Sequence, residues 1–192
     1  MPAINPERLL GDLYALRKIG TYKTGVHRPT LSPADVVSRQ WLLERMAEAD
    51  LDAQIDGIAN VFGRSRVRGR IILAGSHIES QNQAGWLDGA LGVIYALEAA
   101  RALRDDPATR NVGVDVIAFC DEEGHFGSYL GSRSFIDDLS EAEIDKARDR
   151  THGHRMRDAP KEVGGSATMS WVGRSRGRLG SAKGHPIHRR SA

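Results

Sequence analysis

The stretch RIILAGSHIESQNQAGWLDGALGVIYALEAARAL, residues 70–103, decides the fold. It opens with a short apolar run at 71–74 that predicts a buried β-strand, and apolar residues at helical spacing follow over about 90–104. A second apolar run, about 114–120, predicts another buried strand. A strand, a helix and a strand of these lengths predict a βαβ unit with parallel strands and a right-handed crossover. The sequence therefore predicts an α/β fold, with a mostly parallel sheet flanked by helices.

Local patterns on either side of this unit predict further elements. Apolar residues three and four positions apart predict a helix over 4–20, and a second helix is expected over about 34–49. Asp56 and Gly57 form a turn pair between two short predicted strands. Residues 137–150 predict a charged helix, since Ser140 followed by Glu143 is the pattern of a capping box.

Polar side chains stand where each strand of the predicted βαβ unit ends. His77 follows the first strand, Glu122 and Glu123 follow the second, and Asp88 stands just before the intervening helix. Because the carboxyl ends of parallel strands lie side by side, we expect these four side chains to converge at one edge of the sheet. Each alone has a plainer interpretation: a hydrogen-bonded loop histidine, a helix N-cap aspartate and an acidic surface loop. Their joint placement favours a shared site.

Several carboxylates around one imidazole repel one another unless a cation balances their charge. Imidazole and carboxylate groups are typical ligands of zinc, manganese and cobalt. With this many carboxylates a pair of ions is conceivable, with one aspartate bridging them. The doubled glutamate would then supply one ligand and one general base.

The quoted stretch, together with VDVIAFCDEEGHFGSYLGSRSF at 114–135, closely resembles the hydantoinase/carbamoylase family of metal-dependent amidohydrolases. This family includes N-carbamoyl-L-amino acid hydrolases, allantoate amidohydrolases and β-ureidopropionases, and it is related to aminoacylases and dinuclear zinc exopeptidases. The resemblance covers roughly residues 5–150. It implies part of a zinc-exopeptidase-like catalytic domain and hydrolysis of a C–N bond in an N-carbamoyl or allantoate-like compound.

The resemblance also implies roles for individual residues. It implies two divalent ions, zinc or manganese with cobalt as a further option, with His77 on one ion, Glu123 on the other and Asp88 bridging them. Glu122 would be the general base. Glu79 stands where many relatives have an aspartate that orients the imidazole, and its extra methylene alters that geometry.

The end of the chain differs in composition from the rest. Residues 1–150 carry a net charge of −5, whereas residues 151–192 carry +7 and are rich in Gly, Ser and Arg. The sequence therefore predicts a domain over 1–150 and a disordered basic tail over 151–192 that is unrelated to the family. The histidine pairs at 152/154 and 185/188 have chelating spacings, but nothing in the sequence fixes them to the sheet edge.

The family's catalytic domain is longer than this chain and uses two further histidine ligands, so the chain is interpreted as an N-terminal fragment with weak or no activity alone. The expected partner is a small ureido or carbamoyl substrate; relatives are homodimers, but their dimerisation domain has no counterpart here. The alternatives are a metallo-exopeptidase or aminoacylase fragment and a non-catalytic truncated product, which could be a subunit completed by another chain. Nucleic-acid binding by the basic tail is disfavoured, because Trp171 is its only aromatic residue. A lone cysteine, and no apolar run typical of a signal or a membrane span, predict a cytoplasmic protein.

Overall fold

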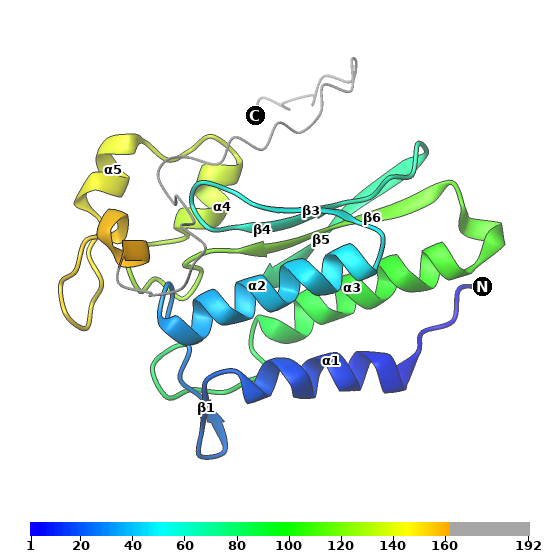
Figure 1. The fold of residues 1–192 in the computed structure, drawn as a ribbon. Coiled ribbons are helices and arrows are strands. Elements are labelled where there is room, and N and C mark those ends of the chain that lie inside the picture. Colours follow the sequence, from blue (N-terminus) through cyan, green and yellow to red (C-terminus); the bar gives the residue numbers. More distant parts are fainter. Residues whose placement is uncertain (162–192) are drawn as a thin grey trace, which may run out of the picture.

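The computed structural model describes residues 1–161 and has a layer of helices packed on one mixed β-sheet (Figure 1). The elements in chain order are α1 (Pro6–Lys18), β1 (Thr21–Tyr22), β2 (Gly25–Val26), α2 (Pro33–Glu48), β3 (Asp52–Ile55), β4 (Val61–Arg64), β5 (Arg70–His77), α3 (Ala90–Asp105), η1 (Pro107–Thr109), β6 (Val112–Phe119), α4 (Leu130–Phe135), α5 (Glu141–Lys146) and η2 (Met156–Lys161). None of the described helices is long and apolar enough to cross a membrane.

The predicted βαβ unit is confirmed as β5, α3 and β6. The two strands pair in parallel from Arg70 opposite Val112 to His77 opposite Phe119. The sheet order is β3-β4-β6-β5, and both the β3–β4 and the β4–β6 pairings are antiparallel. The α/β class is therefore correct, but the described sheet is mixed rather than mostly parallel. The reason is that β3 and β4 form a hairpin, and this hairpin adds antiparallel to the far edge of β6.

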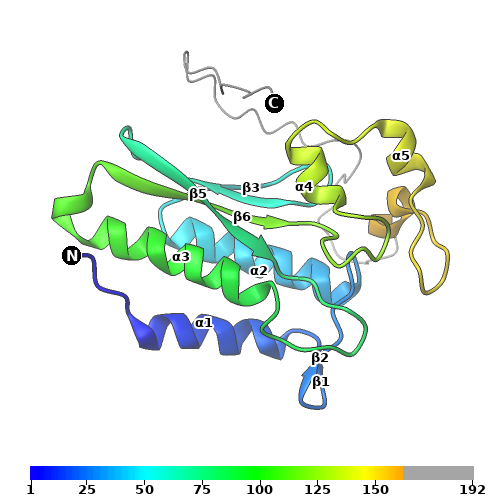
Figure 2. The same cartoon turned by 180° about the vertical axis from the view of Figure 1, so that it is seen from behind.

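The expectation that residues 71–74 form a buried strand is wrong. Ile71, Ile72 and Leu73 keep 38%, 52% and 44% of their surface exposed. Within the described chain β5 is an edge strand, so only one neighbour shields it (Figure 2). By contrast, β6 lies between β4 and β5 and is mostly buried. An apolar run therefore indicated a strand correctly but not its position in the sheet.

The main hydrophobic core lies between the sheet and the helices on one of its faces. The predicted helices at 4–20, 34–49 and 90–104 are α1, α2 and α3; α2 packs on β3 and β4, α3 packs on β5 and β6, and α1 packs on α3 (Figure 1). Buried leucine, isoleucine, valine and methionine side chains fill these contacts, among them Leu16, Leu42, Met46, Val93 and Leu97. The opposite face carries α4, whose Phe135 contacts Phe62 and Phe119 edge to face.

The ordered chain continues past Arg150, where the sequence predicts that the domain ends. The Asp149 carboxylate accepts hydrogen bonds from the backbone N–H groups of Thr151, His152 and His154, which closes a turn. Met156 then enters the small core around Leu139 and Ile144 and keeps only 4% of its surface exposed. Arg157 also pairs with Glu141 and Asp145 of α5, and a β-bridge joins Arg148 to Arg155. These contacts and buried Met156 hold a segment whose composition predicts disorder. The predicted tail from residue 162 onward lies outside the described residues.

The helix predicted over 137–150 forms only as α5, with the expected capping box. The Ser140 hydroxyl accepts a hydrogen bond from the Glu143 N–H, and the Glu143 carboxylate accepts one from the Ser140 N–H at 2.9 Å. Arg133 also donates to this carboxylate at 2.7 Å. Arg133 and the Ser140 backbone together lower the pKa of Glu143 to about 2.

This lowered pKa predicts how α5 responds to acid. The stabilisation is complete above about pH 4.5, the ordinary pKa of an unfolded glutamate, and is lost as the pH falls through about 2. The Ser140 amide resonance should therefore titrate with a midpoint near 2 in an NMR titration. This transition should vanish in Glu143→Gln and persist in Glu7→Gln, which changes an acid in the first turn of α1. A midpoint near 4.5 would contradict the capping-box geometry.

Candidate metal centre

Three side chains that are far apart in sequence meet at the carboxyl edge of β5 and β6. His77 ends β5, Asp88 lies just before α3, and Glu123 lies in the loop after β6. Each offers a ligand atom, and these atoms all lie within 4.8 Å of one another. No other group of three or more His, Cys, Asp or Glu side chains within residues 1–161 is placed in this way.

A tight turn after β6 carries the paired glutamates to this edge. Asp121 has a left-handed backbone (φ 62°), and its carbonyl accepts the Gly124 N–H at 3.2 Å. The buried Asp121 carboxylate accepts the N–H groups of Phe126 and Gly127 at 3.0 and 2.8 Å. Burial raises the pKa of Asp121 to about 7, although these two hydrogen bonds oppose the shift. Because Asp121 fixes both ends of the turn, Glu122 and Glu123 return towards β5.

The imidazole of His77 is held in one tautomer by the chain that follows it. Its Nδ1 lies 3.2 Å from the Glu79 carbonyl oxygen. Because a carbonyl only accepts hydrogen bonds, Nδ1 carries the proton and the lone pair of Nε2 is left for a ligand.

Gly89 lies directly against the His77 ring. Its backbone is left-handed (φ 67°), and a Cβ at this position would come within 2.3–2.4 Å of three ring atoms. Glycine therefore lets the imidazole approach the start of α3, next to Asp88. The sequence analysis treats Gly89 only as part of the beginning of a helix. Its position directly after Asp88, a possible metal ligand, is the one feature of the sequence that could have indicated its role.

Glu79 contacts Glu122 and Arg39 through its carboxylate and His77 through its backbone carbonyl. It is 1% exposed; one carboxylate oxygen accepts the Glu122 N–H at 2.7 Å, and the other accepts from Arg39 at 3.0 Å. The nearest carboxylate oxygen is 3.9 Å from His77 Nδ1, so the Glu79 backbone carbonyl, not its carboxylate, orients the imidazole. Burial raises the pKa of Glu79, and the positive charge of Arg39 opposes this shift.

The two glutamates of the pair have different surroundings. Oε1 of Glu122 is buried and accepts no hydrogen bond from the described residues. Glu123 accepts a hydrogen bond from Gln81 Nε2 at 2.6 Å, and its carbonyl accepts from Arg150 at 2.5 Å. Gln81 and Arg150 therefore support the site, and sequence reasoning misses both because nothing in the local pattern marks them.

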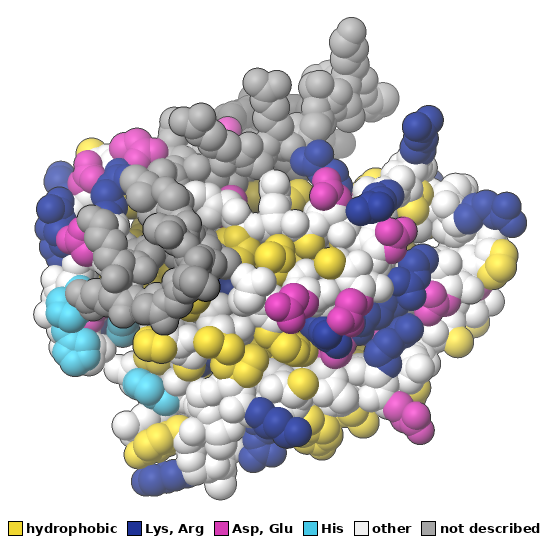
Figure 3. Space-filling model, in the orientation of Figure 1, with side chains coloured by type: hydrophobic (Ala, Val, Ile, Leu, Met, Phe, Trp, Pro, Cys, Tyr) yellow, Lys and Arg dark blue, Asp and Glu magenta, His cyan; other side chains and the backbone are white. Residues whose placement is uncertain are grey.

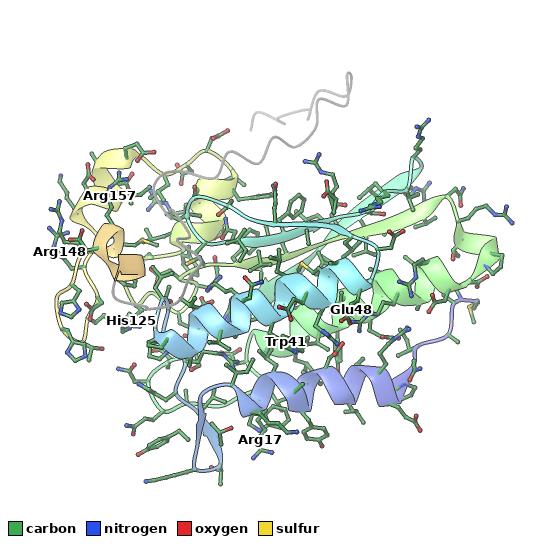
Figure 4. All side chains as sticks on the ribbon, in the orientation of Figure 1. Arg17, Trp41, Glu48, His125, Arg148 and Arg157 are labelled. Atoms are coloured by element: carbon green, nitrogen blue, oxygen red, sulfur yellow. The ribbon has the colours of Figure 1, made fainter. Side chains whose placement is uncertain are left out.

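A cavity of about 380 Å³ lies beside this loop, between the N-terminal end of α2 and the turn after Asp149. His125, which lines it, lies near the start of α2 in Figure 4. Four histidines line it, namely His27, His125, His152 and His154. Histidine side chains gather at this end of the molecule in Figure 3. Burial lowers the pKa of His125. The rings of His152 and His154 lie with their centroids 5.5 Å apart and are tilted by 32° to each other, and neither residue belongs to the His77 group. His185 and His188 lie outside the described residues.

The donor set suits a divalent cation. One imidazole nitrogen and two carboxylates from separate elements offer ligand atoms within 4.8 Å of one another. Glu122, which the sequence predicts to join them, is not part of this group; its Oε1 is buried and accepts no hydrogen bond from the described residues. Nitrogen and oxygen ligands in this combination are typical of zinc, manganese or cobalt.

Comparisons with known proteins identify relatives of this chain. Residues 58–151 match the family model of peptidase family M28. The chain is 31% identical over 163 residues to an N-carbamoyl-L-amino-acid amidohydrolase from Paenarthrobacter aurescens, covering 82% of this chain and 39% of that protein. It is 33% identical over 170 residues to an allantoate deiminase from Arabidopsis thaliana, covering 83% of this chain and 31% of that protein.

Solved structures show the same relationship. The crystal structure of an amidase of the hydantoinase/carbamoylase family from Burkholderia phymatum superposes with a TM-score of 0.84 and 48% sequence identity, covering 91% of this chain and 42% of that one. The chain thus spans about two-fifths or less of the length of these relatives. The shared fold and the sequence identity lead to one conclusion: the chain belongs to the hydantoinase/carbamoylase family of amidohydrolases.

Proposed function

We propose that this chain supplies the divalent-metal centre of an enzyme that hydrolyses a C–N bond in a ureido or N-carbamoyl compound. The observation that carries the proposal is the convergence of His77, Asp88 and Glu123. Glu122, the chain neighbour of Glu123, adds a buried carboxylate oxygen that has no hydrogen-bond partner among the described residues. The names of the relatives, N-carbamoyl-L-amino-acid amidohydrolase and allantoate deiminase, support the substrate class.

In this proposal each residue has a separate task. His77 through Nε2, Glu123 and a bridging Asp88 would hold two ions, zinc or manganese. Bound there, the ions would polarise the substrate carbonyl and acidify a water molecule. Glu122 would accept the proton of the attacking water at Oε1 and pass it to the departing nitrogen, because this oxygen is buried and has no competing donor among the described residues.

The length of the chain bears on the activity that it has alone. Since it spans about two-fifths of its relatives, we propose that 1–150 is the family-derived part of the chain and that its turnover alone is weak but measurable. The match to peptidase family M28 favours a second candidate, a dinuclear exopeptidase or aminoacylase site built from the same residues.

Turnover measurements with Glu122→Gln test the proposal. Hydrolysis of N-carbamoyl-L-amino acids and of allantoate should depend on added zinc or manganese, and Glu122→Gln should reduce it by about 100-fold or more while zinc still binds. Turnover that survives chelation, or that Glu122→Gln leaves intact, would contradict the proposal. Cleavage of dipeptides instead would favour the exopeptidase candidate, and no turnover with any metal would favour the non-catalytic product.

A further inference from the structure

We propose that Arg39 is a positioning residue of the candidate metal centre, because it holds Glu79 as the link between the ends of β5 and β6. This inference rests on the proposed function for its metal-binding consequence, although not for its structural part. Arg39 touches none of the three candidate ligands, and it lies in α2, outside the βαβ unit that carries them.

Arg39 is fully buried, and each of its three guanidinium nitrogens donates a hydrogen bond. Its Nε donates to Asp35 at 2.8 Å, its Nη1 to the Ala59 carbonyl at 2.7 Å, and its Nη2 to Glu79 at 3.0 Å. Asp35 and Glu79 are also fully buried at the side chain. A guanidinium presents its donors in a rigid planar fork, so one side chain can satisfy three acceptors in different elements at once.

Glu79 transmits this anchoring to both strand ends. Its second carboxylate oxygen accepts the Glu122 N–H, and its backbone carbonyl holds His77 Nδ1. Ile78, which lies between His77 and Glu79, is held in turn by Arg28. Arg28 is 1% exposed and donates to the Ile78 carbonyl at 2.8 Å. Glu79 therefore makes hydrogen bonds with both the His77 ring and the Glu122 backbone, and Arg39 fixes the orientation of the Glu79 carboxylate.

The charge of Arg39 matters as well as its shape. Without Arg39, no cation of the described chain would hydrogen-bond to the buried carboxylates of Asp35 and Glu79. Arg28 lies near both, but its side chain donates only to backbone carbonyls. A buried carboxylate that loses its partner is no longer held in one orientation and turns towards water. This movement weakens the hydrogen bond from the Glu122 N–H to Glu79. Loss of Arg39 should thus loosen the loop that carries Glu122 and Glu123.

Hydrogen exchange at the Glu122 amide, measured by NMR in the metal-free chain, tests the structural part. Arg39→Met should speed exchange at Glu122 by about 10-fold or more relative to the central β6 amides. The matched control is Arg101→Met, which removes another buried arginine, paired with Asp12 on the far side of α3, and should change Glu122 and β6 together. Arg39→Lys keeps the charge but not the fork, so an intermediate effect is expected. Glu79→Gln offers the same test without an unpaired charge, should Arg39→Met fail to fold.

Zinc titration of the same variants tests the consequence for the site. Arg39→Met should weaken zinc binding by about 10–100-fold, whereas Arg101→Met should leave it within about 2-fold. Equal effects of the two arginine variants on the Glu122 amide, or no effect of Glu79→Gln there, would overturn the role of Arg39. If the unmodified chain binds no zinc, the proposed function fails, while the exchange measurement still decides whether Arg39 positions Glu122.

Discussion

Gly89→Ala is expected to weaken zinc binding by about 100-fold or more while the chain stays folded. The new methyl group would lie within 2.3–2.4 Å of the His77 ring, which is far inside contact distance. The ring cannot yield towards Glu79 without breaking its Nδ1 hydrogen bond. A left-handed backbone at φ 67° adds strain for any residue with a Cβ, so the start of α3 and Asp88 should shift as well.

Gly85→Ala is the matched control, because a Cβ there would meet nothing within 4 Å. Calorimetric zinc titration of both variants and the unmodified chain separates the two positions. We expect Gly85→Ala to bind zinc as the unmodified chain does. Equal affinity of the Gly89→Ala chain would show that the His77 ring does not bind the metal where the structure places it.

Leu97→Ala is expected to lower the free energy of unfolding by about 2–5 kcal/mol. Leu97 has no exposed surface and belongs to the core between α3 and the sheet. Removing three heavy-atom groups from a closely packed interior loses their burial and leaves a cavity that neighbouring side chains fill only in part. Asp88 lies just before this helix, so the loss should affect the whole βαβ unit, including the candidate metal centre.

Leu10→Ala on α1 is the matched control, since Leu10 is 47% exposed. It should change stability by no more than about 0.5 kcal/mol. Urea unfolding followed by circular dichroism gives both values. Similar losses in the two variants would mean that α3 does not pack on the sheet as described.

The sequence could predict the βαβ unit and the meeting of its polar ends, because period and topology together dictate both. A strand, a helix and a strand force His77, Asp88 and Glu123 to one edge, and the three side chains do lie together there. The roles assigned to them, and to Glu122, remain predictions. The resemblance to the family supplied those roles, and no spacing in the chain could have done so.

Other features could not be predicted because they depend on partners distant in the chain. The exposure of Ile71 and Ile72 depends on which strand occupies the sheet edge, and no local pattern records this. The antiparallel hairpin β3–β4 was predicted as a hairpin but not placed beside β6. In the sequence Arg39 looks like an ordinary polar helix residue, whereas the structure buries it against Asp35 of its own helix and acceptors from two other segments.

The central claim is that His77, Asp88 and Glu123 hold a divalent ion together. Equilibrium dialysis against zinc, followed by metal analysis of the unmodified chain, His77→Ala and Asp88→Ala, tests it most directly. The claim predicts at least one zinc per unmodified chain and a loss of affinity of about 100-fold or more in each variant. Retention of zinc by both variants at the affinity of the unmodified chain would contradict it.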